Sequence, residues 1–421
     1  MRKIDCEVAV IGGGPAGLAA AVGAYDAGAK DVIVIERDKH LGGILQQCIH
    51  NGFGLHVFGE DLTGPEYAQR YIEQAGQRQI KCLRQTMVLE LGEGNQILAA
   101  KAGEGIIRID PKAIVLAMGC RERTRGAISL PGARPAGILT AGTAQRFINM
   151  EGYLPGKKIV ILGSGDIGMI MARRLHLEGA QVKAVVEIME CIGGLNRNLV
   201  QCLGDFDIPL YLQHTVTDIR GQKRLESVKV APLINGKADT AREFVIDCDT
   251  LLLSVGLIPE NELSKQVGVK LDSNTGGPMV DQYFQTSVPG MFAAGNIVLV
   301  FDLVDHVSVC GHKAGESAAM YAQGKIKGWN GQSVSVGCGE GIRCVVPQKL
   351  NNIEGEQEVR FYMRAAQVHR QAKLKMTDDR GETICEKRFQ IARPPEMLSV
   401  QVAGVKTGTG KKYVFELQGE V

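Results

Sequence analysis

A stretch near the start of the chain recurs, with the same internal spacing, at a constant offset of 151 residues. The first copy spans residues 6–43 and the second spans residues 158–194. Six glycines and one glutamate match: Gly12, Gly14, Gly17, Gly28, Glu36, Gly42 and Gly43 correspond to Gly163, Gly165, Gly168, Gly179, Glu187, Gly193 and Gly194. One G-x-G-x-x-G stretch is weak evidence for a fold, whereas two copies with equal glycine-to-acid spacing are strong evidence.

Each copy predicts a strand, a glycine turn, a helix and a second strand. Residues 7–11 and 158–162 are mostly apolar, as is typical of buried parallel strands. The first glycine permits a tight turn, the second lets the backbone approach a pyrophosphate, and the third lets helix and strand pack closely. The helix N-terminus then offers free amides to the phosphates. The sequence therefore predicts two dinucleotide-binding domains in one chain.

The acid that ends each repeat bears on the choice of nucleotide. Glu36 and Glu187 each lie 24 residues beyond the first glycine, where a carboxylate can accept hydrogen bonds from ribose hydroxyls. A carboxylate at the ribose repels a 2′-phosphate, so Glu187 favours NAD(H) over NADP(H) in the second site. Arg173 and Arg174 belong to the predicted helix rather than to the strand end. An alternative is that the second site is a relic that binds nothing.

Length and composition exclude several classes of protein. A chain of 421 residues predicts two or three domains. A net charge of +2 argues against nucleic acid or an anionic membrane as the main partner. The basic and apolar start superficially resembles a signal peptide, but its glycine spacing favours a strand, turn and helix. No apolar run is long enough to predict a membrane-spanning helix, so a cytoplasmic protein is the simplest expectation.

The cysteines and histidines predict no metal site. The 11 cysteines are scattered and include no C-x-x-C, which indicates a reducing compartment rather than a disulfide framework. Cys338 and Cys344 lie six residues apart, which matches neither a zinc knuckle nor a common iron–sulfur spacing. Five histidines show no useful pairing in the sequence, namely His40, His56, His176, His214 and His312.

Three further stretches, added to the repeat, carry a family resemblance: residues 59–75, 112–132 and 286–298. With them, the chain resembles the pyridine nucleotide–disulfide oxidoreductase superfamily, in the branch that includes thioredoxin reductase, over residues 5 to about 325. The resemblance implies FAD in the first site and a nicotinamide nucleotide in the second. The superfamily usually has aspartate where this chain has Asn296, so the hydrogen bond to the ribityl chain of the flavin survives while a charge disappears.

The resemblance implies a set of cofactor contacts. The candidate FAD residues are Gly12, Gly14, Pro15, Ala16, Gly17, Glu36, Arg37, Gly42, Gly43, Asn51, Val88, Met118, Gly119, Gly295, Asn296 and Val304. The candidate NAD residues are Gly163, Gly165, Asp166, Gly168, Glu187 and Gly256. A helix is expected after residue 302, with Asp302 or Asp305 as its cap. The first amides of that helix, around Val304, would face the flavin pyrimidine and stabilise negative charge on the reduced ring.

A narrower resemblance concerns residues 119–145, the Gly295–Asn296 pair and the DLVD stretch at 302–305. These resemble the flavin subunits of opine or amino-acid oxidases, of hydrogen cyanide synthase, and of flavoproteins associated with glycerol-3-phosphate dehydrogenase-like subunits. The resemblance implies a subunit of a multi-subunit dehydrogenase, with a partner flavoprotein or a small redox protein. A homo-oligomer is a further possibility.

Hydride transfer between nicotinamide and flavin N5 needs alignment more than side-chain acids. Disulfide reductases place C-x4-C after the first glycine pair or C-x-x-C in the NAD domain, and here only Cys48 follows Gly42 and Gly43. Disulfide reduction by this chain alone is therefore not expected. Cys48 could lie over the flavin as a thiolate, although a buried loop cysteine is favoured. His50 and His306 could relay a proton, or could be exposed or structurally bonded.

The predicted fold is α/β, with two Rossmann-like domains of three layers built on parallel sheets, the second inserted in the first, and a small C-terminal β domain. The expected limits are 1–120 and 257–332 for the FAD-binding domain, 121–256 for the NAD-binding domain and 333–421 for the C-terminal β domain. Strands are predicted in the last domain at 358–368, 371–377, 382–392, 396–403 and 411–418, with a hairpin turn at 377–381. Such a domain is expected to dock a partner or another copy.

Three functions remain open at the level of sequence. The leading hypothesis is an FAD-dependent, NAD(H)-linked oxidoreductase that serves as the electron-transfer subunit of a larger dehydrogenase. A second hypothesis is a stand-alone NADH oxidase or reductase of a small acceptor that uses Cys48. The third is a non-catalytic nucleotide-binding scaffold subunit.

Overall fold

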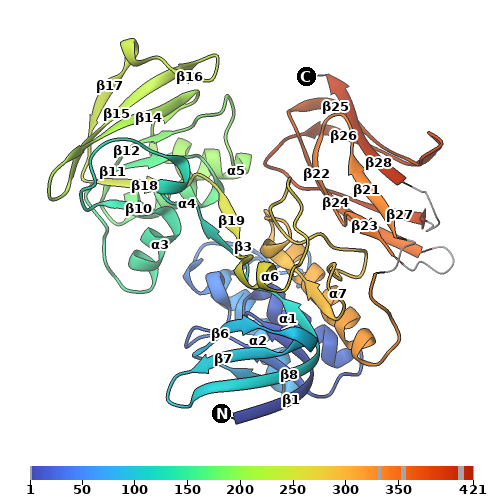
Figure 1. Cartoon of the computed structure of the whole chain (residues 1–421). Coiled ribbons are helices and arrows are strands. Elements are labelled where there is room, and N and C mark those ends of the chain that lie inside the picture. The colour runs from blue at the N-terminus through green and yellow to red at the C-terminus, as the bar shows by residue number, and fades with distance from the viewer. Residues whose placement is uncertain (1, 330–332, 352–356, 406–411, 421) are drawn as a thin grey trace. The chain divides into compact units, whose positions relative to one another are not determined.

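The computed structural model describes residues 2–329, 333–351, 357–405 and 412–420 (Figure 1). The chain forms two compact units. The first unit comprises residues 1–120 and 259–421, and the second comprises residues 121–258. The second unit is thus inserted in the first, and the short strands β9 (Cys120–Glu122) and β19 (Leu257–Pro259) on the two connections pair with each other.

A seven-stranded sheet forms the centre of the first unit. The parallel strands are β1 (Arg2–Ile11), β2 (Val32–Ile35), β5 (Lys81–Leu83), β8 (Gly105–Leu116) and β20 (Met291–Ala293). The antiparallel strands are β6 (Thr86–Leu91) and β7 (Ile97–Lys101). A separate short ribbon pairs β3 (Asn51–Phe53) with β4 (Leu62–Thr63). Strand β1 is buried along its second half, as the apolar sequence predicts for a central parallel strand.

Two helices of the first unit pack unusually closely because small residues face each other. They are α1 (Pro15–Asp26) and α7 (Val304–Ala322), which lie side by side in blue and orange (Figure 1). A Cβ atom on Gly311 would lie 2.3 Å from the carbonyl oxygen of Ala16, and one on Gly315 would lie 1.9 Å from that of Ala20. The backbone of α7 therefore rests directly on α1, and the second turn of α7, at Gly311, lies against the first turn of α1, at Ala16.

The remaining helices of the first unit are short or peripheral. Helix α2 (Gly64–Gln77) begins with a capping box between Thr63 and Glu66. Helix α6 (Glu262–Gln266) is a short segment after the second connection. Short 3₁₀ or π segments also occur among the described residues, namely η1 (Gly43–Gln47), η2 (Glu93–Asn95), η3 (Gly126–Ile128), η4 (Leu199–Leu203), η5 (Gly204–Phe206), η6 (Thr240–Arg242) and η7 (Gly295–Ile297).

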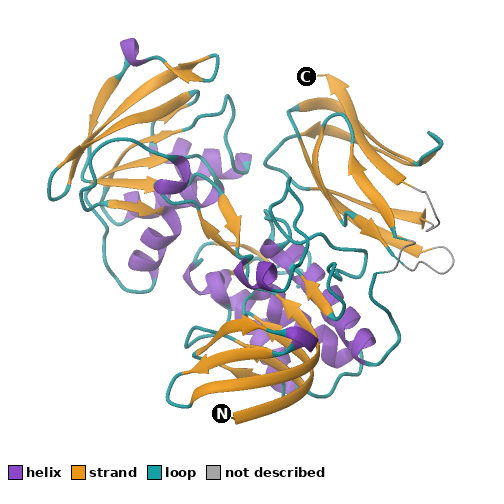
Figure 2. Ribbon diagram, viewed as in Figure 1, coloured by secondary structure: helices purple, strands orange, loops and turns teal. Residues whose placement is uncertain are grey.

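The second unit has three layers around a five-stranded parallel sheet (Figure 2). Its order is β10 (Ile138–Thr140), β18 (Thr250–Leu253), β11 (Lys158–Leu162), β12 (Gln181–Val186) and β13 (Leu210–Tyr211). The helices are α3 (Ala141–Asn149), α4 (Asp166–Leu177) and α5 (Asn196–Asn198). The antiparallel strands are β14 (His214–Gly221), β15 (Leu225–Ile234), β16 (Lys237–Ala238) and β17 (Phe244–Asp247). Alternate residues of β11 face the two outer layers, Ile159 and Ile161 toward the helices and Val160 and Leu162 toward the antiparallel strands.

The C-terminal β domain is a sandwich of two sheets around its own apolar core. The five-stranded sheet contains β21 (Val334–Cys338), β23 (Lys349–Leu350), β25 (His369–Thr377), β26 (Thr383–Ala392) and β28 (Lys412–Glu420). The three-stranded sheet contains β22 (Ile342–Val346), β24 (Gln357–Ala365) and β27 (Leu398–Val405). The five predicted strands are confirmed, except that residue 411 lies outside the described residues, and the hairpin turn joins β25 to β26. The strands between 334 and 350 were not foreseen.

Candidate functional site

The first glycine framework brings a strand, a helix and two loops into backbone contact. Gly12 has a φ of +108°, and a Cβ atom there would lie 2.4 Å from the carbonyl oxygen of Ala117. A Cβ atom on Gly17 would lie 1.8 Å from the carbonyl oxygen of Gly12. Gly43 packs against Gly14, with 3.0 Å between its ideal Cβ position and the Gly14 Cα. Only glycine fits these contacts, and together they form a backbone-lined cradle at the start of α1.

The start of α1 has no side-chain cap. Its N-cap is Gly14, which provides no side chain to cap the first amides, and Pro15 and Ala16 open the helix. A helix N-terminus with free amides and a positive dipole end is suited to phosphate groups. The amide of Gly42 donates to the carbonyl oxygen of Gly13 at 2.8 Å, which ties the Gly42–Gly43 pair to the same cradle.

Glu36 is held at the end of β2 by backbone amides. Its side chain is only 7% exposed, and the carboxylate accepts from the amide of Gly13 at 2.7 Å and from that of Asp38 at 2.7 Å. A carboxylate oxygen has more than one lone pair, so both oxygens keep capacity for a further donor such as a ribose hydroxyl. The neighbouring Arg37 is exposed.

The second unit reproduces this arrangement. Glu187 is 5% exposed and accepts from the amide of Ser164 at 2.7 Å, from the Ser164 hydroxyl at 2.6 Å and from the amide of Met189 at 3.0 Å. Gly163 has a φ of +98°, and a Cβ atom there would lie 2.1 Å from the carbonyl oxygen of Ser254. The same two constraints, a crowded first glycine and an acid on backbone amides, therefore occur in both units.

Other predicted residues of the second site also lie around the start of α4. Gly165 is the N-cap without a side-chain cap, and a Cβ atom on Gly168 would lie 2.8 Å from the carbonyl oxygen of Gly163. The Asp166 carboxylate accepts from the Leu195 amide at 2.8 Å and from the side-chain amide of Asn198 at 2.6 Å. Asp166 thus organises the 195–198 turn. Gly256, with a φ of +101°, lies at the end of the second unit.

The start of α7 is uncapped, contrary to the expectation that Asp302 or Asp305 would cap it. The N-cap is Leu303, and within the part of the chain that the structure describes no side-chain cap hydrogen bond is formed there. Asp305 instead accepts from the amides of Gly54 at 3.3 Å and Val57 at 2.9 Å. Asp302 accepts from the amide of Met397 at 2.9 Å. The cap prediction is wrong because both carboxylates serve backbone donors from distant segments, which leaves the amides around Val304 available.

Two further predicted FAD residues, Gly295 and Asn296, lie in the short helix η7. The side-chain oxygen of Asn296 accepts from the amide of Phe301 at 3.0 Å, so its amide nitrogen is the group left to donate. Gly295 packs against Ala16 of α1, since a Cβ atom there would lie 2.7 Å from the Ala16 Cβ.

Met118 and Gly119 follow the end of β8, and Gly119 has a φ of +71°. Asn51 lies in the β3–β4 ribbon. Val88 is buried in the core of the first unit, so a ligand could meet only its backbone.

Cys48 has the contacts of a structural residue. Its thiol donates to the carbonyl oxygen of Ile44 at 3.3 Å, and its own carbonyl oxygen accepts from the amide of Gly64 at 2.8 Å. A Cβ atom on Gly64 would lie 2.8 Å from the Cys48 Cβ, so the cysteine packs on the first residue of α2. Burial raises the pKa of the Cys48 thiol to about 12. The side chain is therefore a neutral thiol at physiological pH.

We expect Cys48→Ser to change turnover by less than about twofold, because a neutral thiol packed on α2 offers no nucleophile. In the unmodified protein, iodoacetamide should label Cys48 roughly a thousand times more slowly than a free cysteine of pKa about 8.5 at mildly alkaline pH. Mass spectrometry of the labelled peptide gives the rate. A labelling rate close to that of the free amino acid would show a reactive thiolate and revive the Cys48-dependent oxidase.

The histidines form a cluster that sequence reasoning only partly foresaw. His306 lies in the first turn of α7, and its ring is stacked near that of His56 at 6.5 Å between centroids. This ring contact joins two segments that lie far apart in the chain, and nothing in the sequence around His56 pointed to it. The His306 ring is also 5.5 Å from that of Tyr362, and burial lowers the pKa of His306 below its usual value. His50 instead contacts Phe53, with the ring centroids 5.0 Å apart.

Two classes of site are not found in the described part of the chain. No group of three or more histidine, cysteine, aspartate or glutamate side chains is arranged to hold a metal ion there. None of the described helices is both long and apolar enough to span a lipid bilayer.

Comparison with known proteins agrees with this geometry. The family described as pyridine nucleotide-disulphide oxidoreductase matches residues 6–314. The HcnB component of hydrogen cyanide synthase from Pseudomonas protegens is 28% identical over 313 residues, which cover 68% of this chain and 65% of that protein. One of the subunits of opine oxidase from Agrobacterium tumefaciens is 24% identical over 316 residues, which cover 69% of this chain and 61% of that protein. The match thus spans less than two thirds of these relatives.

A solved structure shares the fold. Thioredoxin reductase of T. acidophilum superposes with a TM-score of 0.61 at 25% identity, covering 75% of this chain and 98% of that one. The family match covers most of the chain, from β1 to the first half of α7, and so includes both glycine frameworks. The chain therefore belongs to the pyridine nucleotide-disulphide oxidoreductase family, a family that binds FAD and a pyridine nucleotide.

Proposed function

We propose that this protein is an NAD(H)-linked flavoprotein that serves as the electron-transfer subunit of a larger dehydrogenase. The observation that carries the proposal is the duplicated cradle, in which Glu36 and Glu187 are bound by backbone amides in the same way. The proposal assigns FAD to residues 1–120 and 257–332, and NAD to residues 121–256. Residues 333–421 are assigned to a domain of their own.

The residues of the first unit fit FAD. The uncapped start of α1 would hold the pyrophosphate, and Glu36 would accept from the adenosine ribose. The uncapped amides around Val304 would face the pyrimidine edge of the flavin, and the side-chain amide of Asn296 would donate to the ribityl chain. When bound, FAD supplies the two-electron chemistry that no side chain here provides.

The loop after β12 supports NAD(H) over NADP(H). It reads Glu187, Ile188, Met189, Glu190 and Cys191, with two acids and no base. Ile188 and Met189 are exposed, so the surface beside the ribose site is apolar and negative. A 2′-phosphate would meet the Glu187 carboxylate, and residues 187–191 hold no cation to compensate for it.

The proposal of a partner rests on the names of two similar proteins and on the neutral thiol of Cys48. Two relatives are named as subunits, of hydrogen cyanide synthase and of opine oxidase. Because Cys48 is a neutral thiol packed on α2, electrons would leave the flavin directly rather than through a cysteine. We propose a partner flavoprotein that oxidises the substrate and exchanges electrons with this chain.

Anaerobic mixing with NADH should bleach the visible flavin band of the purified protein, while NADPH should require at least about tenfold higher concentration for half of the effect. Stopped-flow absorbance at matched concentrations measures both. If neither nucleotide bleaches the flavin, the nicotinamide part of the proposal is wrong. A colourless protein that only stabilises a catalytic partner would support a scaffold instead.

A further inference from the structure

The first turn of α7 is held on one side by residues of the FAD-binding domain. Asp305 accepts from two amides in the loop of residues 54–57. One turn further along, the Ser308 hydroxyl accepts from the hydroxyl of the buried Tyr67 in α2, at 2.8 Å. These contacts fix that side of the helix start and use none of its first amides.

The C-terminal β domain holds the other side through one face of β24. Alternate residues of this strand enter the sandwich core, namely Val359, Phe361 and Met363. Tyr362 belongs instead to the core of the FAD-binding domain, and Arg364 reaches the segment that leads into α7. The strand thus divides its side chains between two cores.

Arg364 and Asp302 form a clamp around that segment. The Arg364 guanidinium donates to the carbonyl oxygen of Val300 at 2.8 Å and lies 3.7 Å from the Asp302 carboxylate. It also donates to the carbonyl oxygen of Pro395 within its own domain. Asp302 accepts from the amide of Met397 at 2.9 Å. The two side chains are only 14% and 9% exposed, so solvent screens this pair weakly.

Tyr362 fills the space beside the clamp. The residue is 2% exposed, and its ring lies 5.2 Å from that of Phe301 and 5.5 Å from that of His306. Its hydroxyl interacts with the thiol of Cys310 in the second turn of α7. Burial raises the pKa of the Cys310 thiol to about 12, and it also raises the pKa of Tyr362, so both groups are neutral.

The same domain is anchored at a second place, which makes the clamp a fixed support. The Gln348 side-chain oxygen accepts from the amide of Val280 at 3.1 Å, and the Gln348 amide donates to the Val280 carbonyl oxygen at 3.1 Å. The amide of Asn351 donates to the side chain of Gln282 at 2.9 Å.

We propose that Arg364 and Tyr362 of the C-terminal β domain are positioning residues that set the reduction potential of the flavin through the start of α7. This inference rests on the proposed flavin site. The helix has no side-chain cap, so its amides are aimed only by the contacts around them. Arg364 acts twice, because it holds the 300–302 segment and offsets the negative charge of Asp302. Negative charge near the ring disfavours its reduction, whereas the helix amides favour it.

The test is the flavin potential, measured by reducing the holoprotein together with a reference dye and following both spectra. Arg364→Met should shift the equilibrium against the reduced flavin by about tenfold, which corresponds to about 30 mV for a two-electron couple. Asp302→Asn removes the opposing charge and should shift the equilibrium the other way. Tyr362→Phe, which loses only the hydroxyl, should shift the equilibrium against the reduced flavin by about threefold.

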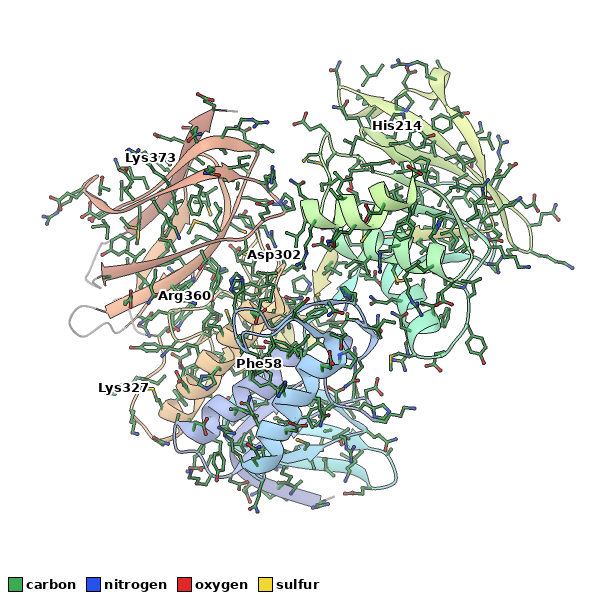
Figure 3. The ribbon with its side chains drawn as sticks, turned by 180° about the vertical axis from the view of Figure 1, so that it is seen from behind. Phe58, His214, Asp302, Lys327, Arg360 and Lys373 are labelled. Atoms are coloured by element: carbon green, nitrogen blue, oxygen red, sulfur yellow. The ribbon has the colours of Figure 1, made fainter. Side chains whose placement is uncertain are left out.

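A matched control uses Lys373, which pairs with Glu386 at 2.8 Å on the other sheet of the same domain. Lys373→Met removes one cation and one ion pair and should leave the potential unchanged; Lys373 and Asp302 are both labelled in Figure 3. Arg364→Lys keeps the positive charge but loses the planar guanidinium that bonds two groups at once. Its flavin potential should therefore lie about halfway between those of the wild type and Arg364→Met. If Arg364→Met is purified without its flavin, the potentials of Arg364→Lys and Tyr362→Phe test the inference instead.

Equal potentials in the wild type and in all the clamp variants would overturn the inference. A rise in potential for Arg364→Met, or a fall for Asp302→Asn, would also overturn it. The proposed function fails separately, since it requires the wild-type protein to bind FAD and to be reduced by NADH. A flavin-bound wild type whose variants keep its potential therefore rejects the positioning role alone, whereas a colourless wild type rejects both.

Discussion

Gly12→Ala should produce protein that has lost its FAD, whereas Gly163→Ala should keep FAD but respond to NADH only at about a hundredfold higher concentration. Both glycines have φ near +100°, and a Cβ atom would lie 2.4 Å and 2.1 Å, respectively, from a carbonyl oxygen. Backbone strain of this kind costs of order 3 kcal/mol, which is about a hundredfold in binding when the cradle must deform. The two variants apply one change to equivalent positions, so their different outcomes assign the two nucleotides.

The measurements are the ratio of flavin to protein after purification and a titration of flavin bleaching by NADH. Gly76→Ala is a suitable control, because Gly76 is an exposed helical residue with no neighbouring atom within 4 Å of its ideal Cβ. It should match the wild type in both assays and gain slightly in stability. If the flavin of Gly163→Ala is bleached by the same NADH concentration that bleaches the wild type, NADH does not bind at the glycine framework of the second unit.

Glu187→Gln should weaken NADH binding by about 10- to 100-fold and reduce the preference for NADH over NADPH. The carboxylate accepts from three donors around Ser164 and Met189, and an amide side chain would turn its own N–H toward one of them. A lost hydrogen bond to a charged group costs about 1.5–3 kcal/mol. The variant also removes the negative charge that opposes a 2′-phosphate, so NADPH loses less affinity than NADH does.

Glu36→Gln is the matched change in the other unit. It should weaken FAD binding to the apoprotein by a similar factor and leave the affinity for NADH unaltered. Calorimetry with FAD, NADH and NADPH separates the three effects. Were Glu187→Gln to bind NADH as tightly as the wild type, the carboxylate would have no part in ribose recognition, and NAD preference would need another source.

Local spacing explains why the frameworks were predictable. The contacts of Gly12 with Gly17, and of Glu36 with Gly13, join residues within one strand–turn–helix–strand unit. A chain that must make these contacts has to place small residues and one acid at set intervals. The strands of the C-terminal β domain were predictable for a similar reason, since alternation of apolar residues follows from a strand with one buried face.

The contacts that position the start of α7 were not predictable in this way. Asp302 and Asp305 resemble helix caps by position, yet they bond to Met397 and to the 54–57 loop. The pairing of His56 with His306 and the reach of Arg364 to Val300 likewise join distant segments. An aspartate at this position could either cap the helix locally or accept a hydrogen bond from a distant segment. The residue is the same in both cases, so the sequence does not distinguish the two roles.

By itself, then, the sequence determined that this protein has two dinucleotide frameworks and where their glycines and acids lie. It also determined that a β domain follows. Each of these features depends on the spacing of residues within a short segment. Only the tertiary structure decided that Cys48 packs on α2 as a neutral thiol, that α7 begins without a cap, and that Arg364 and Tyr362 support its first turn. These properties arise from burial and from contacts between distant segments, which leave no periodic pattern in the chain.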